Sequence, residues 1–95
     1  MLILLTKVRK VTSFGVAMPE LVDRIVSMDT IKQLEFGDRT TTINNRDGTV
    51  DIYTMDAGAP GKLRDAIVEA AAAASHAVVS CDGGSDVRVI HHRSF

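Results

Sequence analysis

Apolar residues recur at helical spacing after Pro60 and then alternate with polar residues toward the end of the chain. Proline is favoured in the first turn of a helix, so this pattern predicts a helix from residue 60 to about residue 74. The apolar face of this helix comprises Leu63, Ala66, Ile67, Ala70, Ala71 and Ala74.

The alternating segment predicts a β-hairpin, with strands at residues 77–81 and 87–92 and a glycine-containing turn at 82–86. If Cys81 pairs with Val87 across this turn, successive side chains fall on opposite faces. One face then carries His76, Val78, Ser80, Arg88, Ile90 and His92, and the other carries Ala77, Val79, Cys81, Val87, Val89 and His91. Both faces carry apolar residues, so the hairpin as a whole has more apolar surface than a single core-facing side requires. The residues that we expect to bind a partner protein are Val78, Arg88, Ile90 and His92.

The rest of the chain predicts one more helix and several strands. Residues 1–11 suit a strand, and residues 18–29 predict a helix because a proline start precedes apolar side chains at helical spacing. Residues 31–36 fit either a strand or a continued helix, and we prefer the strand. Residues 40–55 predict a hairpin, because runs of β-branched residues flank an Asn-Arg-Asp-Gly turn.

The Asp-Gly pair of that turn also predicts the register of the hairpin. Ile43 then faces Ile52 and Asn45 faces Val50, which turns Val50 and Ile52 inward and Tyr53 outward. The order of elements predicts a single α+β domain covering all 95 residues, with a mainly antiparallel sheet and two helices. This order resembles a ferredoxin-like βαββαβ plan with an extra C-terminal strand.

Composition narrows the class of protein and its partners. Hydrophobic residues make up 45% of the chain and the net charge is −1, which is ordinary for a folded soluble protein and does not point to nucleic acid or an anionic membrane. Cys81 is the single cysteine, so no intrachain disulfide forms, and we expect a reducing compartment, the cytoplasm. The apolar run at residues 2–5 is too short to span a bilayer and suits the start of a strand.

The start of the second predicted helix offers an alternative binding site. Backbone N–H groups at a helix N-terminus attract anions, and the residues that would hold one are Gly58, Ala59, Gly61 and Lys62. Residues 56–63 are locally similar to the strand-to-helix turn of ACT regulatory domains, which bind amino acids, although that family carries the turn before its first helix. The similarity implies an amino acid as the ligand of a small-molecule sensor.

A further alternative is nucleic-acid binding through the basic first strand. Lys7, Arg9 and Lys10 place three positive charges close together with no acid between them, which suits contacts to phosphates. The competing interpretation is an edge strand whose cations discourage the addition of another strand. The near-neutral net charge and the aromatic content of 4% favour the edge strand.

Residues able to carry chemistry are few and scattered. His76 and His92 would lie opposite each other, but two imidazoles are too few for a structural zinc site, so we predict no metal site; a pH-sensitive contact is the other interpretation. Cys81 is surrounded by valines, which favours a buried inert thiol over a nucleophile. The serines lack a G-x-S-x-G context, and the glycine-rich segments lack the spacing of nucleotide-binding loops. We therefore expect no catalytic residue and no cofactor.

By elimination, the sequence favours a small non-enzymatic protein-binding module: an adaptor, regulator or inhibitor that acts as a homodimer. The identity of the protein partner does not follow from the residues. The amino-acid sensor and the nucleic-acid binder are the alternatives.

Overall fold

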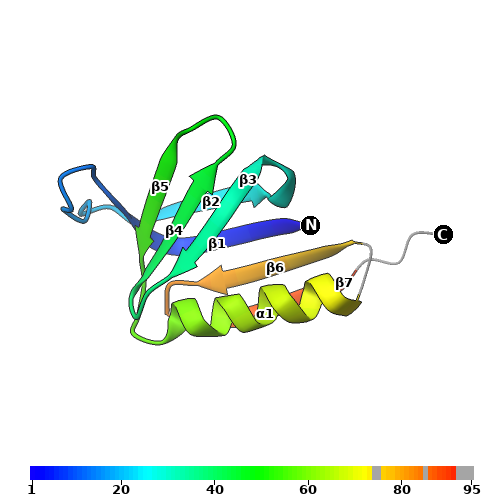
Figure 1. Ribbon diagram of the computed structural model, residues 1–95. Helices are drawn as coiled ribbons and strands as arrows, with labels where there is room; N and C mark the ends of the chain where they lie inside the picture. Colours follow the sequence, from blue (N-terminus) through cyan, green and yellow to red (C-terminus); the bar gives the residue numbers. More distant parts are fainter. Residues whose placement is uncertain (74–75, 85, 92–95) are drawn as a thin grey trace.

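Seven strands and one α-helix make up the described part of the computed structural model, which covers residues 1–73, 76–84 and 86–91 (Figure 1). In chain order, the elements are β1 (Leu2–Val11), β2 (Val22–Ser27), a 3-10 turn η1 (Met28–Thr30), β3 (Ile31–Phe36), β4 (Thr40–Asn45), β5 (Val50–Thr54), α1 (Ala59–Ala73), β6 (Ala77–Asp82) and β7 (Val87–His91).

The central strand β1 belongs to two halves of one curled sheet. Its first part pairs with β2 on one side, antiparallel, and with β6 on the other side, parallel; β7 then pairs with β6. Residues 9–11 of β1 pair instead with β5, which continues through β4 to β3. We call the order β2-β1-β6-β7 the first half-sheet and β1-β5-β4-β3 the second half-sheet. Figure 1 shows the second half-sheet rising at an angle from β1 and β6.

A bulge in β1 produces this change of partner. Lys7 adopts a left-handed backbone with φ 54°, and the pairing register with β2 shifts between Leu5 and Val8. Alternation alone would place Leu5 and Val8 on opposite faces, but the irregularity lets both side chains point into the core. Gly83 closes the bend from the other side, because its N–H donates to the Thr6 carbonyl at 2.7 Å.

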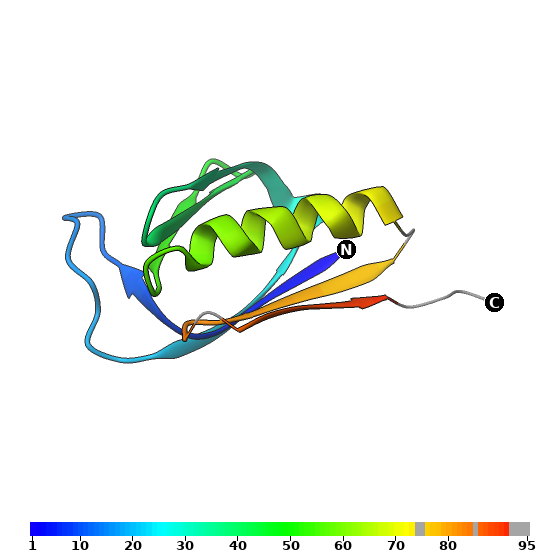
Figure 2. The ribbon, with the colours of Figure 1, turned by 90° about the horizontal axis from the view of Figure 1, so that it is seen from below.

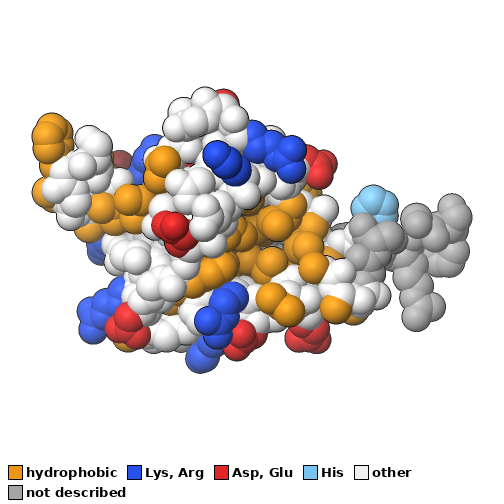
Figure 3. All heavy atoms as spheres, in the orientation of Figure 1, with side chains coloured by type: hydrophobic (Ala, Val, Ile, Leu, Met, Phe, Trp, Pro, Cys, Tyr) orange, Lys and Arg blue, Asp and Glu red, His pale blue; other side chains and the backbone are white. Residues whose placement is uncertain are grey.

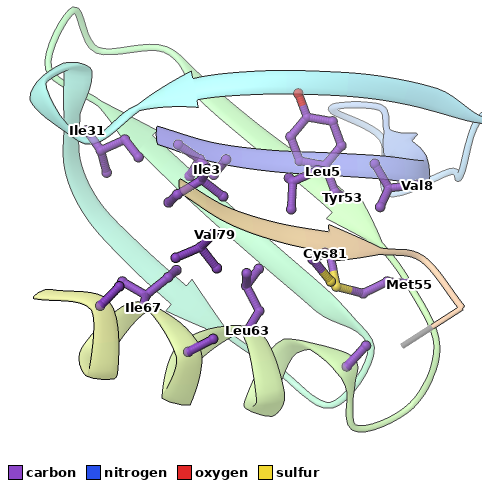
Figure 4. Packing of buried hydrophobic residues seen from close by; sticks show 14 of the residues in the cluster. Ile3, Leu5, Val8, Ile31, Tyr53, Met55, Leu63, Ile67, Val79 and Cys81 are labelled. Carbon is purple, nitrogen blue, oxygen red and sulfur yellow. The ribbon is translucent and has the colours of Figure 1, made fainter. Parts of the chain in front are cut away.

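Helix α1 lies on the concave side of the sheet, over β6 and β7 (Figure 2). Its buried residues are Ala59, Pro60, Leu63, Ala66, Ile67 and Ala70. Leu63 and Ile67 project toward Val79 and Ile3 in the close view of the core (Figure 4). The alanines between them let the helix approach the sheet closely, as the helical spacing predicts. Ala71, which we expected on the same face, is exposed.

The predicted ferredoxin-like plan with two helices is wrong, because residues 18–29 do not form a helix. Strand β2 occupies residues 22–27 and η1 adds a single 3-10 turn. Pro19 lies in the connection before β2, where it begins no helix. The β-branched Val22, Ile25 and Val26 suit the pleat of a strand, and pairing with β1 satisfies their backbone groups. The fold is therefore a mostly β domain with a mixed sheet and one helix within the described residues.

The 40–55 hairpin forms, but its predicted register is wrong by one residue. Ile43 pairs with Asp51 rather than Ile52, and Val50 pairs with Asn44. The turn is longer than two residues, because the Asn45 N–H donates to the Thr49 carbonyl and so closes the hairpin around residues 46–48. A shift of one residue exchanges the two faces of a strand. Tyr53 is consequently buried, with 1% of its surface exposed, whereas Val50 is exposed.

Three other predictions are confirmed. Residues 31–36 form the strand β3, the helix begins beside Pro60, and the last hairpin has the expected register. Cys81 pairs with Val87 and Ala77 pairs with His91. The expected pairing of His76 with His92 involves a residue outside the described part of the chain.

Candidate functional site

The first half-sheet has one face covered by α1 and one face bare. Val79 and Cys81 of β6 point toward the helix and are fully buried. Val78 lies between them in an alternating strand and therefore points the other way. Its pairing partners are Leu2 in β1 and Ile90 in β7, so these two side chains share its face.

On the uncovered face, one apolar row crosses β1, β6 and β7, and a neighbouring apolar pair extends it to β2. The remaining positions of these two rows are polar: Ser27, Ser80 and Arg88. Leu4 lies two residues from Leu2 on the same face of β1 and pairs with Ile25 of β2. We call Leu2, Leu4, Ile25, Val78 and Ile90 the outer-face cluster. The exposed fractions are 68% for Ile25, 49% for Ile90 and 41% for Leu2, whereas Leu4 and Val78 are half-buried. The cluster is thus continuous along the paired strands and open to solvent.

Charged side chains near the outer-face cluster are paired within the chain. The Arg88 guanidinium lies 3.1 Å from an Asp86 carboxylate oxygen at the β7 end, and Lys7 Nζ lies 3.7 Å from Asp82 at the far end of β1. Such exposed pairs add little stability. Asp23, on the same face of β2 as Ile25, adds one carboxylate, which accepts a hydrogen bond from the Lys7 N–H. The surroundings of the cluster are thus close to neutral.

The alternating pattern of the last hairpin predicts Val78, Arg88 and Ile90 on one face, and the structure brings these three residues together there. The fourth expected partner-binding residue, His92, lies outside the described residues. Strand pairing adds residues that the sequence analysis missed: Leu2, Leu4 and Ile25. The alternation of residues 2–5 was hidden, because all four positions are apolar.

A polar hollow of about 750 Å³ lies between β2 and the β4–β5 turn. Its polar groups largely bind one another. Asn45 donates to Thr49 and to Asp51, each at 3.0 Å, and Asp47 accepts from both the N–H and the hydroxyl of Thr49. The Thr49 hydroxyl and backbone lower the pKa of Asp47. This arrangement stabilises the turn and presents no pair of groups for acid–base chemistry.

The buried Tyr53 places its hydroxyl toward β2, at the edge of the core (Figure 4). Burial raises the pKa of this phenol, and the nearby Asp51 carboxylate raises it further, while Arg24 opposes the change through its charge and a hydrogen bond. The phenol therefore stays protonated at neutral pH and acts as a polar anchor for the curled sheet.

The cations proposed for nucleic-acid binding are engaged within the chain. Lys7 contacts Asp82, Lys10 lies 3.4 Å from Asp51, and the Arg9 guanidinium donates to the Pro19 carbonyl. The competing interpretation of an edge strand is wrong, because β1 is the central strand that the two half-sheets share. Lys7 instead occupies the bulge that bends this strand.

The proposed anion site at the start of α1 has several of its donors occupied. The Gly58 N–H donates to the Asp38 carbonyl at 2.9 Å, and the Ala59 N–H donates to the Asp56 carbonyl at 3.0 Å. Pro60 has no N–H to offer. Gly61 and the exposed Lys62 remain beside this segment, and Ala59 is buried. The segment thus caps the helix with its own backbone.

The single cysteine lies in the core. Burial raises the pKa of the Cys81 thiol to about 11, and the neighbouring Asp82 and Asp86 carboxylates add to the effect. A neutral thiol is a poor nucleophile. Among residues 1–73, 76–84 and 86–91, no three histidine, cysteine or acidic side chains come together as metal ligands.

The β1–β2 connection projects from one end of the molecule (Figures 1 and 3). Its tip is ordered by two backbone hydrogen bonds, from the Thr12 N–H to the Val16 carbonyl and from the Gly15 N–H to the Thr12 carbonyl. Phe14 at this tip is 92% exposed. In Figure 3, hydrophobic side chains are also visible between α1 and the second half-sheet. Leu34 and Phe36 of β3 are partly buried and pack against the core.

Comparisons with protein-family models, curated proteins and solved structures give no match. Within the described ranges, the chain has no helix with both the length and the apolar composition that crossing a bilayer requires. The geometry of the chain itself therefore carries the functional proposal.

Proposed function

We propose that this protein is a small non-enzymatic protein-binding module that works as a homodimer, and that its two copies meet through the outer-face cluster. One observation carries the proposal: α1 covers the Val79 and Cys81 face of the first half-sheet and leaves the Val78 and Ile90 face to solvent. An exposed apolar surface such as the outer-face cluster, with members on four adjacent strands, is typical of a surface that another protein covers.

A second copy fits this face because the face is self-complementary. An apolar centre can pack against its own image across a two-fold axis, with the two sheets about 10 Å apart. The nearby ion pairs, Lys7 with Asp82 and Arg88 with Asp86, are neutralised within each copy. Two identical faces therefore approach one another without strong repulsion, and polar groups surround an apolar interior as in known interfaces.

The exposed area is compatible with a dimer of moderate affinity. Leu2, Ile25 and Ile90 together expose roughly 300 Å² per copy, so that burying both copies' side chains contributes about 15 kcal/mol. Association removes the translational and rotational freedom of one molecule relative to the other. This loss costs roughly 4 to 15 kcal/mol. With a cost of about half of the contribution from burial, the dissociation constant is on the order of micromolar.

Sedimentation velocity over a concentration series from nanomolar to high micromolar tests this proposal. The wild-type protein should convert from monomer to dimer within the series. Ile90→Lys should remain monomeric, because two lysines would be buried at the two-fold interface. Val68→Lys, an equally drastic change at an exposed position of α1 outside the cluster, should dimerise like the wild type. A wild-type protein that remains monomeric at every concentration would contradict the proposal of a homodimer.

The buried Cys81 thiol also supports placing the protein in a reducing compartment such as the cytoplasm. Fractionation of cells that produce the protein should recover it with the cytoplasmic fraction. Recovery with a secreted fraction would contradict this placement.

A further inference from the structure

Strand β7 ends the first half-sheet, and a groove runs beside it. Within the described residues, β7 pairs only with β6, so its other edge has no neighbouring strand. A groove of about 650 Å³ follows this edge, with α1 as one wall. The helix contributes Lys62, Asp65, Ala66 and Glu69, at the spacing of one helical face, and the strand side contributes Asp86, Val87 and Val89.

The edge of β7 lacks the features that protect other sheet edges from pairing. The edge strand β3 carries Lys32 and a register shift between Ile31 and Gln33, both of which discourage an added strand. Pairing of β6 with β7 is regular over five consecutive residue pairs, from Ala77–His91 to Cys81–Val87. Val87–His91 contains neither proline nor lysine. The outward N–H and C=O groups of β7 thus form a regular ladder that an extended backbone can complete.

The charges in the groove determine which extended segment fits. Three carboxylates, those of Asp65, Glu69 and Asp86, line it together with one ammonium group, that of Lys62. The guanidinium groups that pair with Asp65 and Asp86, those of Arg64 and Arg88, do not line the groove, so carboxylates outnumber ammonium groups in its lining. Glu69 takes part in neither pair. A second copy of β7 would bring a second set of these carboxylates to the same edge, so the charges favour a cationic partner over self-pairing.

We propose that the β7 edge and the α1 groove bind an extended segment of another protein, with lysine or arginine alternating with apolar residues, as an added antiparallel or parallel strand. The cationic side chains of that segment point toward the groove, where they meet Glu69 and Asp65. Its alternating apolar side chains point to the opposite face, on the side of Ile90. The inference rests on the proposed protein-binding function, but not on the dimer. The added strand pairs with the backbone edge of β7, whereas the dimer uses the side chains on the outer face, Ile90 among them.

Two synthetic peptides test the proposal by NMR titration of the ¹⁵N-labelled full chain. The first has the sequence acetyl-Thr-Val-Lys-Val-Lys-Val-Thr-amide, and the second has glutamate in place of both lysines. The lysine peptide should shift amide signals in Val87–His91 and on the groove face of α1, and should slow hydrogen exchange of β7 amides. The glutamate peptide should bind at least about fivefold more weakly, because it faces the carboxylates.

Protein variants separate the groove from general charge. Glu69→Lys should weaken binding of the lysine peptide about fivefold, whereas Glu35→Lys, an equal charge change on exposed β3, should not change it. A lysine peptide with N-methylated alternate amides should not bind, because it cannot complete the ladder.

Three outcomes would overturn the proposal: no shift at millimolar lysine peptide, equal shifts with the glutamate peptide, or equal binding of the N-methylated peptide. Protection of β7 amides in the free protein that disappears on dilution would show that a second copy fills the edge, and would also overturn it. Sedimentation of the same samples reports the dimer independently, so failure of the peptide site and failure of the homodimer are distinguishable.

Discussion

Replacing Gly83 with alanine should destabilise the protein strongly, because this glycine touches the backbone of the bulge in β1. A Cβ atom at Gly83 would lie 2.1 Å from the Lys7 carbonyl oxygen and 3.0 Å from the Lys7 carbonyl carbon. Both neighbours are backbone atoms in the middle of the central strand. They cannot rotate away as the end of a flexible side chain can, so the loop after β6 must move by more than about 1 Å.

The structure indicates the size of the effect. Such a movement breaks the hydrogen bond from the Gly83 N–H to the Thr6 carbonyl, at 2.7 Å, and weakens that from the Asp56 N–H to the Gly83 carbonyl, at 3.2 Å. Each bond contributes about 1 kcal/mol net, and strained packing adds a similar amount. The expected loss is about 3 kcal/mol, out of a total stability of about 5 to 10 kcal/mol for a domain of this size.

Urea unfolding followed by far-UV circular dichroism measures this loss. Gly83→Ala should lower the midpoint by about 2 M urea at an unchanged slope. Gly84→Ala is the matched control, because a Cβ there meets only an Asp82 carboxylate oxygen at the ordinary distance of 3.6 Å. Equal midpoints for the two variants would refute the packing of Gly83 against β1, and with it the reason for the change of partner along that strand.

The core and its titratable groups give four further predictions. Leu63→Ala should lower the free energy of unfolding in urea by about 3 kcal/mol, because Leu63 is fully buried on the inner face of α1. Val68→Ala, on the exposed face of α1, should lower it by less than about 0.5 kcal/mol. The Cys81 thiol should resist Ellman's reagent at pH 8 until the protein unfolds, and rapid reaction of the folded protein would contradict its burial. Because folding raises the pKa of Cys81 from 9.0 to about 11, its contribution to stability should be complete below pH 9 and decline as the pH rises toward 11. Cys81→Ala should remove this part of the decline. Ultraviolet titration of Tyr53, the single tyrosine, should give a pKa above 10.0 in the folded protein, and an unshifted titration would contradict its burial.

The sequence predicted an element correctly where its local pattern fits only one regular structure. Pro60 and the spacing of Leu63, Ala66 and Ile67 fit a helix and no strand, and α1 forms there. The two-glycine turn and the short alternating strands on either side set the register of β6 and β7. The prediction that Val78 and Ile90 share a face was therefore within reach of the sequence.

Residues 22–28 misled the sequence analysis, because their apolar positions fit two periods. Val22, Ile25 and Val26 match helical spacing, but the same positions also suit a strand. In the strand β2, Val22 and Val26 face the core and Ile25 faces the solvent. Pairing with β1, a contact distant in sequence, favours the strand. The same error hid one member of the outer-face cluster, since Ile25 joins it only through that pairing.

The bulge at Lys7 could not be predicted from residue type. A left-handed backbone is expected of glycine or asparagine and not of lysine, so the sequence marks nothing unusual there. The contact of Gly83 with the Lys7 carbonyl holds this conformation from 76 residues away. In the β4–β5 turn, the Asp47 carboxylate accepts from Thr49 and so stabilises a longer loop than an Asp-Gly pair alone predicts.

The most direct test of the homodimer is a filtered NMR experiment on a mixture of ¹³C-labelled and unlabelled protein, which detects only contacts between copies. The account predicts intermolecular signals among the methyl groups of the outer-face cluster: Leu2, Leu4, Ile25, Val78 and Ile90. Intermolecular signals that arise only from other surfaces, or none at a concentration at which sedimentation shows a dimer, would contradict it.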